Sequence, residues 1–135
     1  MASYGYEEVD HTADIALKVW GEDFQTLLSL AAEGFYVLIG VEPLLNDPVD
    51  TCFVIPLDDY ENVIVDFLNE LLYLLEERGQ TFTGFAFTEK EDNLVIRASG
   101  FKALSQDRYI KAVTFHDLNI EESEHGLEVI ITFDV

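Results

Sequence analysis

The chain has almost no cysteine, few basic residues and no long apolar run, and each shortage excludes something. One of its 135 residues is a cysteine, so neither an intramolecular disulfide nor a zinc site of several cysteines can form. Cys52 lies in the apolar run 51–55, where we expect a thiol buried in the core. No apolar run approaches the roughly 20 residues of a membrane-spanning helix, and the first residues do not resemble a secretory signal. We therefore expect a cytoplasmic protein without membrane contact.

Basic residues are scarce. Seven lysines and arginines stand against 27 aspartates and glutamates, which gives a formal net charge of −20. Nucleic-acid affinity depends largely on cations that neutralise phosphates, so strong direct binding of RNA or DNA is disfavoured, as is an anionic membrane surface. The balance favours multivalent cations or a basic protein partner, although surplus acid can also serve solubility alone.

What the sequence does contain is enough apolar material for one packed domain. Hydrophobic residues make up 49% of the chain and aromatic residues 13%, which is typical of a globular protein. The length fits a single core, and no internal repeat or interdomain linker is evident. We therefore assign residues 1–135 to one domain. Within it, Pro43 and Pro48 predict a loop over residues 41–48.

Hydrophobic periodicity predicts two helices and several strands. Apolar residues recur at helical spacing over residues 24–38, with Asp23 as a cap, and over residues 63–75, which Gly79 follows. Strand-like patterns occupy residues 15–20, 51–55, 82–87, 94–98, 111–120 and 127–135. The late hairpins favour an α+β fold, with two helices packed on a mainly antiparallel β-sheet.

The second predicted helix carries an acidic face. Asp66, Glu70, Tyr73 and Glu77 follow one another at spacings of three and four residues, so they lie on one side of the helix. A face of this kind is usually just solvated. The alternative is a docking surface, which makes Asp66 and Glu70 candidate functional residues.

Three polar segments carry the candidate chemistry, since the sequence lacks generic motifs such as a phosphate-binding glycine loop or H-E-x-x-H. The segments are Asp10-His11-Thr12-Ala13-Asp14, Lys111-Ala112-Val113-Thr114-Phe115-His116 and Phe133-Asp134-Val135. The first is equally well interpreted as a capped turn before a strand. In the second, a simple strand would put Lys111 and His116 on opposite faces, so they share a site only across a bulge or loop.

Two carboxylates in these segments suggest a cation site. Alternation puts Asp14 with Ala16 and Trp20 on the non-core side of the first strand, and Asp134 on the non-core side of the last, next to the carboxylate of Val135. If the two aspartates are close, their repulsion is relieved by a proton or by a bridging cation. Hard oxygen ligands favour Ca²⁺, Mg²⁺ or Mn²⁺ over zinc or copper.

The sequence resembles the archease family in four segments spread along the chain. Three are the polar segments above, and the fourth is Val65-Asp66-Phe67-Leu68-Asn69-Glu70-Leu71-Leu72-Tyr73. Any one of them would be a weak signal, but four in the same order and at the same separations, in a chain of this length, are specific. The family often has tryptophan at the position of Phe67 and tyrosine at that of Phe115, and both are aromatic exchanges.

The resemblance implies a small α+β protein that is not itself an enzyme. Archeases assist the GTP-dependent RNA-splicing ligase of the RtcB type, which joins RNA ends through a covalent guanylate intermediate. The accessory protein promotes guanylylation of the ligase and its repeated turnover. Whether the setting is tRNA splicing or RNA repair stays open.

The resemblance also implies site residues. Family metal ligands correspond to Asp14 and Asp134, together with the carboxylate of Val135, and Ca²⁺ is the first expectation for the metal. Lys111 matches a functionally important family lysine. His11 and His116 lie inside the family motifs as further candidates.

Two other functions remain as alternatives. A free-standing metal-dependent phosphoester hydrolase would use the carboxylates with Lys111 and His116 as metal ligands, electrophile and acid–base groups. A chaperone-like interaction module would instead use the acidic helix face around Asp66 and Glu70, with a purely structural metal site.

Overall fold

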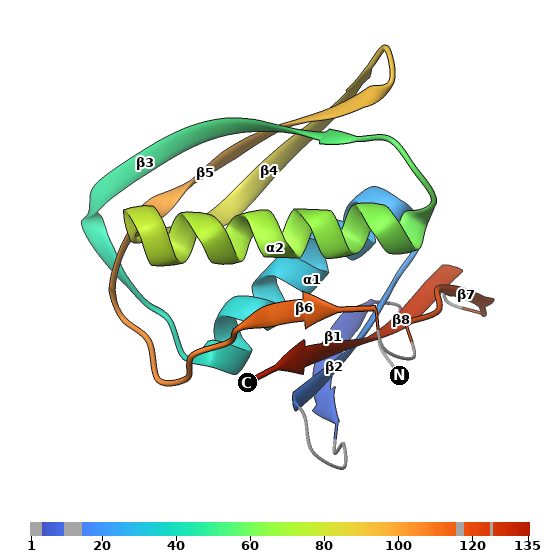
Figure 1. Cartoon of the computed structure of the whole chain (residues 1–135), viewed down its shortest axis with the longest axis horizontal. Coiled ribbons are helices and arrows are strands. Elements are labelled where there is room, and N and C mark those ends of the chain that lie inside the picture. The colour runs from blue at the N-terminus through green and yellow to red at the C-terminus, as the bar shows by residue number, and fades with distance from the viewer. Residues whose placement is uncertain (1–3, 10–14, 116–117, 125) are drawn as a thin grey trace.

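This computed structural model describes residues 4–9, 15–115, 118–124 and 126–135. The described part of the chain contains two helices and eight strands (Figure 1). In chain order they are β1 Gly5–Val9, β2 Ile15–Gly21, α1 Phe24–Ile39, β3 Glu42–Pro56, α2 Tyr60–Arg78, β4 Gln80–Lys90, β5 Asn93–Ser105, β6 Ala112–Thr114, β7 Glu121–Ser123 and β8 Gly126–Asp134.

The strands form two separate sheets. One has the order β1-β2-β8-β6, with β7 also paired to β8, and the other has the order β3-β5-β4. Every one of these pairings is antiparallel. The predicted α+β class is therefore confirmed, but the strands divide between two sheets where we expected one.

The helices form the layer between these sheets (Figure 1). α1 contacts β2 of the first sheet and β4 of the second, and α2 contacts β6 of the first and both β3 and β4 of the second. This arrangement explains why both helices are apolar around most of their circumference. Their buried residues include Phe35, Phe67, Leu68 and Leu71, which are fully enclosed. Within the described residues, neither helix is long and apolar enough to cross a membrane.

Short-range side-chain contacts define the helix ends. The carboxylate of Asp23 accepts a hydrogen bond from the Thr26 N–H at 2.8 Å, and that of Asp59 accepts one from the Asn62 N–H at 2.9 Å. Each carboxylate satisfies an N–H that the helix itself leaves unpaired. Gly79 ends α2 in the left-handed region at φ 61°, where glycine is favoured. The predicted cap at Asp23 and the predicted stop at Gly79 are confirmed.

The loop predicted over residues 41–48 is wrong, because β3 already begins at Glu42. All three prolines of the chain, Pro43, Pro48 and Pro56, lie in this strand. β3 is an edge strand, where the missing proline N–H need not cost a ladder hydrogen bond. The pairing with β5 shifts register between Leu44 and Pro48. The turn residues therefore mark an irregularity inside a strand.

Both faces of β2 are covered. Leu17 and Val19 are buried as predicted, but Ala16 and Trp20, expected on the non-core side, are also only 0% and 8% exposed. Trp20 pairs with Gly5 of β1, and a Cβ built on Gly5 would lie 2.9 Å from Cζ2 of the Trp20 ring. The ring thus covers Gly5 on the side that alternation had assigned to solvent.

β8 is the strand on which the first sheet depends, since it pairs with β2, β6 and β7. Among its core residues, Phe133 is 0% exposed and stacks on Phe35 of α1 with ring centroids 5.8 Å apart. Ile130 on the same strand is 43% exposed.

Replacing Phe133 by alanine should lower the free energy of unfolding by about 3–5 kcal/mol, because a fully buried aromatic ring is lost and a cavity remains. Urea denaturation measures the change. Ile130→Ala is the matched control and should cost below about 1 kcal/mol. Equal losses in the two variants would contradict the assignment of Phe133 to the core.

Candidate functional site

Pairing of β6 with β8 brings two of the three polar segments together. The Lys111 N–H donates to the Asp134 carbonyl oxygen at 2.8 Å, and the Cα of Ala112 is paired with that of Asp134. The side chains of Lys111 and Asp134 are exposed, and Val135 is 46% exposed. Ile110, on the other side of Lys111, is buried. The result is a small polar edge of the first sheet, here called the Lys111–Asp134 edge.

A side chain of α2 holds β6 in place. The carboxamide oxygen of Asn69 accepts a hydrogen bond from the Val113 N–H at 2.9 Å, and its Nδ2 donates to the Val113 carbonyl at 3.2 Å. One amide thus satisfies both polar backbone groups of Val113, as a neighbouring strand would. The Oε1 of Glu61, two turns earlier on α2, accepts from the Ile120 N–H at 3.2 Å. These contacts tie β6 and the segment between β6 and β7 to the helix.

Sequence reasoning did not single out Asn69. The available signal was an asparagine in the middle of an otherwise apolar and acidic helix, where asparagine is disfavoured because its amide competes for backbone hydrogen bonds. In this structure the backbone group that Asn69 binds belongs to another element, which removes the conflict.

Exposed apolar side chains flank the Lys111–Asp134 edge along the chain. Tyr109 is 74% exposed and Phe115 is 53% exposed, and they lie just before and just after β6. Tyr73, one turn beyond Asn69 on α2, is 51% exposed. Exposed aromatic residues next to a polar site are typical of protein–protein contact surfaces.

The acidic face of α2 is largely exposed. Asp66 and Glu77 are exposed and Glu70 is half-buried. Asp66 lies one turn before Asn69 and Glu70 directly follows it, so both are neighbours of the residue that holds β6. A role in docking stays a prediction.

Three of the predicted site residues, His11, Asp14 and His116, lie outside the described residues. The described register between β2 and β8 ends with Ile15 paired to Phe133. Asp14 precedes the first of these residues in sequence and Asp134 follows the second. The part of the chain that the structure describes contains no group of three or more His, Cys, Asp or Glu side chains placed to hold a metal ion. The predicted site requires Asp14, so it stays a prediction.

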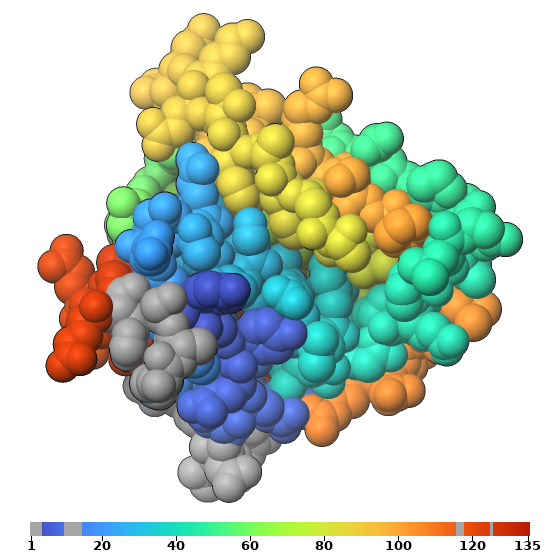
Figure 2. Space-filling view, turned by 180° about the vertical axis from the view of Figure 1, so that it is seen from behind, coloured from blue at the N-terminus to red at the C-terminus, as the bar shows by residue number. Residues whose placement is uncertain are grey.

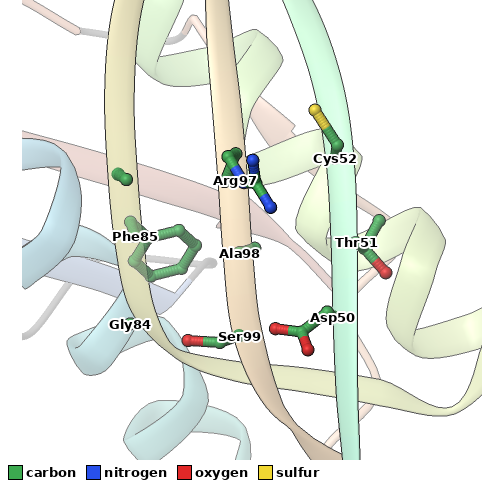
Figure 3. Close-up of a pocket in the computed structure, with 9 residues that line it drawn as sticks. Asp50, Thr51, Cys52, Gly84, Phe85, Arg97, Ala98 and Ser99 are labelled. Atoms are coloured by element: carbon green, nitrogen blue, oxygen red, sulfur yellow. The ribbon is translucent and has the colours of Figure 1, made fainter.

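A separate shallow groove of about 600 Å³ crosses the outer face of the other sheet (Figure 3). Cys52 of β3 and Arg97 of β5 are paired across it, next to Asp50 and Ser99. Cys52 is exposed, so the prediction of a core thiol is wrong. The reason is strand alternation: Phe53 packs on Phe67 of α2, with centroids 6.3 Å apart, and its neighbour Cys52 faces outward.

Taken together, these features define a small α+β protein whose two helices lie between two antiparallel sheets, with a polar edge at the end of β8. Comparisons with known proteins assign its family. The sequence profile of the Archease protein family (MTH1598/TM1083) matches residues 6–135. The chain belongs to the archease family.

Individual relatives agree with that assignment. The protein archease of Methanosarcina barkeri is 32% identical over the full length of both chains, and that of Pyrococcus furiosus is 25% identical over 90% of this chain and 91% of its own. The crystal structure of an archease, described as a possible chaperone, from Thermotoga maritima superposes with a TM-score of 0.72 over 96% of each chain at 23% identity. The solution structure of Methanobacterium thermoautotrophicum protein 1598 gives 0.71 over 97% of this chain and 99% of its own, at 22% identity. The likeness to these structures confirms the fold.

Asn69→Ala should destabilise the protein by about 1–3 kcal/mol, since it leaves the half-buried N–H and carbonyl of Val113 without their partner. The Val113 amide should also exchange with solvent faster, which hydrogen exchange followed by NMR measures. Asn119→Ala is the control, because the Nδ2 of Asn119 donates to the exposed carboxylate of Glu121, at 3.0 Å, rather than to a buried backbone group. Unchanged exchange at Val113 would rule out the anchoring role.

The exposure of Cys52 predicts that its thiol reacts with Ellman's reagent in the native protein without denaturant. Cys52→Ser should abolish the reaction, as it removes the only cysteine of the chain. If labelling required urea, the outward orientation of Cys52 would be incorrect.

Proposed function

We propose that this protein is a non-catalytic accessory protein that activates an RNA-splicing ligase of the RtcB type. The observation that carries the proposal is the match to the archease family over residues 6–135, in a chain where β6 and β8 bring Lys111 beside Asp134. Both residues belong to segments through which the sequence resembles archeases. The accessory, chaperone-like character also agrees with the description of the Thermotoga maritima relative.

Charge determines which partner such a protein can approach. At a net charge of −20 it repels the phosphate backbone of RNA, so it is suited to meet the protein component of an RNA-processing complex. A ligase that holds RNA needs a basic surface, and opposite charges accelerate encounter at low salt. The exposed Tyr73, Tyr109 and Phe115 supply apolar contact area beside the Lys111–Asp134 edge.

A divalent metal ion bound at this edge is part of the proposal. Asp134 offers hard carboxylate oxygens on an exposed strand end, and Asp14 is the proposed second ligand, next in sequence to the residue paired with Phe133. Val135 is the third proposed ligand, and Ca²⁺ the first expectation for the metal. Such an ion supplies positive charge to attract phosphate oxygens. Lys111 carries an ammonium group exposed at the same edge, where it can contact a phosphate or carboxylate of the partner.

The test is multiple-turnover RNA ligation by a purified RtcB-type ligase, with and without this protein and with metal supplied. We expect more turnovers per ligase, fading as salt rises because the encounter is electrostatic. Lys111→Met and Asp134→Asn should each reduce the gain at least about tenfold, since each removes a charge-assisted contact of about 1.5–3 kcal/mol.

Lys102→Met and Asp92→Asn are the matched controls. Lys102 lies on β5 of the other sheet and donates to the carbonyl of Arg78 at the end of α2, and Asp92 lies in the turn between β4 and β5, so neither should change the gain. A folded Asp134→Asn protein with full effect would remove this site from the proposal. No effect of the unchanged protein on the ligase would remove the function itself. Phosphoester hydrolysis without any ligase would favour the hydrolase alternative.

A further inference from the structure

The two edges of the three-stranded sheet are protected differently. At one edge, β3 carries all three prolines of the chain and a shifted register, both of which discourage the addition of another strand. At the other edge, β4 contains no proline and, among the described residues, pairs with β5 alone. β4 has an irregularity between Phe82 and Gly84, and residues 84–90 are then regularly paired with residues 93–99. β4 thus presents a regular, unpaired edge.

A groove runs beside this edge, between β4 and α1. It consists of two hollows of about 530 and 510 Å³ that share Ser29, Leu30 and Phe85 in their walls. One hollow extends toward Val37 and Val41, and the other toward Phe87. Figure 2 shows α1, in light blue and cyan, lying alongside the yellow β4, and both hollows are lined by residues of these two elements. Its walls are largely aliphatic and aromatic, as expected of a site for apolar side chains.

A polar group in the wall of this groove lacks a partner. Tyr36 is 8% exposed, and among the described residues its hydroxyl has no contact with full hydrogen-bond geometry. Burial raises the pKa of this hydroxyl, and the nearby Phe82 backbone and Thr81 side chain offset part of the rise without satisfying the group. A buried hydroxyl without a partner is uncommon in folded proteins, so this group marks the wall of the groove as polar and unsatisfied at one point.

Charge selects the occupant. Glu22 and Glu33 line the groove, and the chain as a whole has a net charge of −20. Pairing of β4 with a second copy of the chain would bring two such charges together, which is strongly repulsive. An extended segment from a basic protein gains attraction at the same place.

We propose that the free edge of β4 and the groove beside it bind an extended, lysine- or arginine-containing segment of a protein partner. The segment pairs its backbone with residues 84–88 and inserts alternate apolar side chains between β4 and α1. This surface lies on the opposite sheet from the Lys111–Asp134 edge, so the proposal stands apart from the proposed activation of a ligase.

The probes are short synthetic peptides that alternate lysine with valine, leucine or phenylalanine, and their glutamate counterparts. Fluorescence anisotropy measures their binding to the full chain. We expect the lysine series to bind and the glutamate series not to, with affinity that falls as salt rises. Amides within residues 84–88 should become protected from hydrogen exchange on binding, because the added strand accepts their hydrogen bonds.

Two substitutions test the groove itself. Ser29→Arg narrows it at the shared wall, and Val37→Arg adds a repelling charge on an exposed position of α1. Each should weaken peptide binding at least about tenfold. Val54→Arg is the matched control, as Val54 is a similarly exposed valine on β3, at 55% against 64% for Val37, and does not line the groove.

Four results would overturn the proposal: no binding by any lysine peptide, equal binding of the glutamate series, full affinity in both groove variants, or no protection in β4. If the peptides bind but the β4 amides gain no protection, then a ligand held by side-chain contacts or a helical ligand occupies the groove. Circular dichroism of each variant verifies that it is folded before binding is compared.

Discussion

The burial of two helices between two sheets is the constraint on which the rest of this structure depends. α1 and α2 are apolar on most sides, so packing against one sheet alone would leave part of their apolar surface exposed to water. The second sheet buries that remaining surface. Phe67 shows this arrangement, since it is fully buried against Phe53, Phe85 and Phe87 of the β3-β5-β4 sheet, while Asn69, two residues later, reaches β6 of the other sheet. α2 therefore links the two sheets.

This middle layer determines where functional groups can lie. The interior is filled by side chains, and polar groups remain available at sheet edges, on the exposed side of α2 and on the outer face of the β3-β5-β4 sheet. At the Lys111–Asp134 edge, Asn69 holds β6 against α2, which fixes the position of a strand of only three residues, 112–114. Glu61 binds the chain further on, at Ile120 before β7. The free edge of β4 has a different origin: α1 contacts β4 from the side and leaves a groove along it.

The acidity of the surface gives both edges a common character. With 27 acidic and seven basic residues, the surface favours partners that bring positive charge. Because basic residues are so few, the contacts that each of them makes help to locate where a partner could bind. Lys18 contacts Glu128 at 3.2 Å and Arg108 contacts Glu8 at 3.3 Å, whereas Lys111 contacts Asp134 through its backbone N–H and is itself exposed at the edge of the sheet.

The sequence by itself determined the helices with their ends at Asp23 and Gly79, most strands, the α+β class and the family, because periodicity, caps and motifs are local properties of the chain. It also marked Lys111 and Asp134 as candidates. Only the tertiary structure decided that the strands form two sheets and that residues 42–48 belong to β3. It also decided that Cys52 is exposed and Trp20 buried, the reverse of what the sequence pattern predicted, and that Asn69 anchors Val113. Each of these depends on which distant segments meet, and alternation along one strand does not specify what covers its second face.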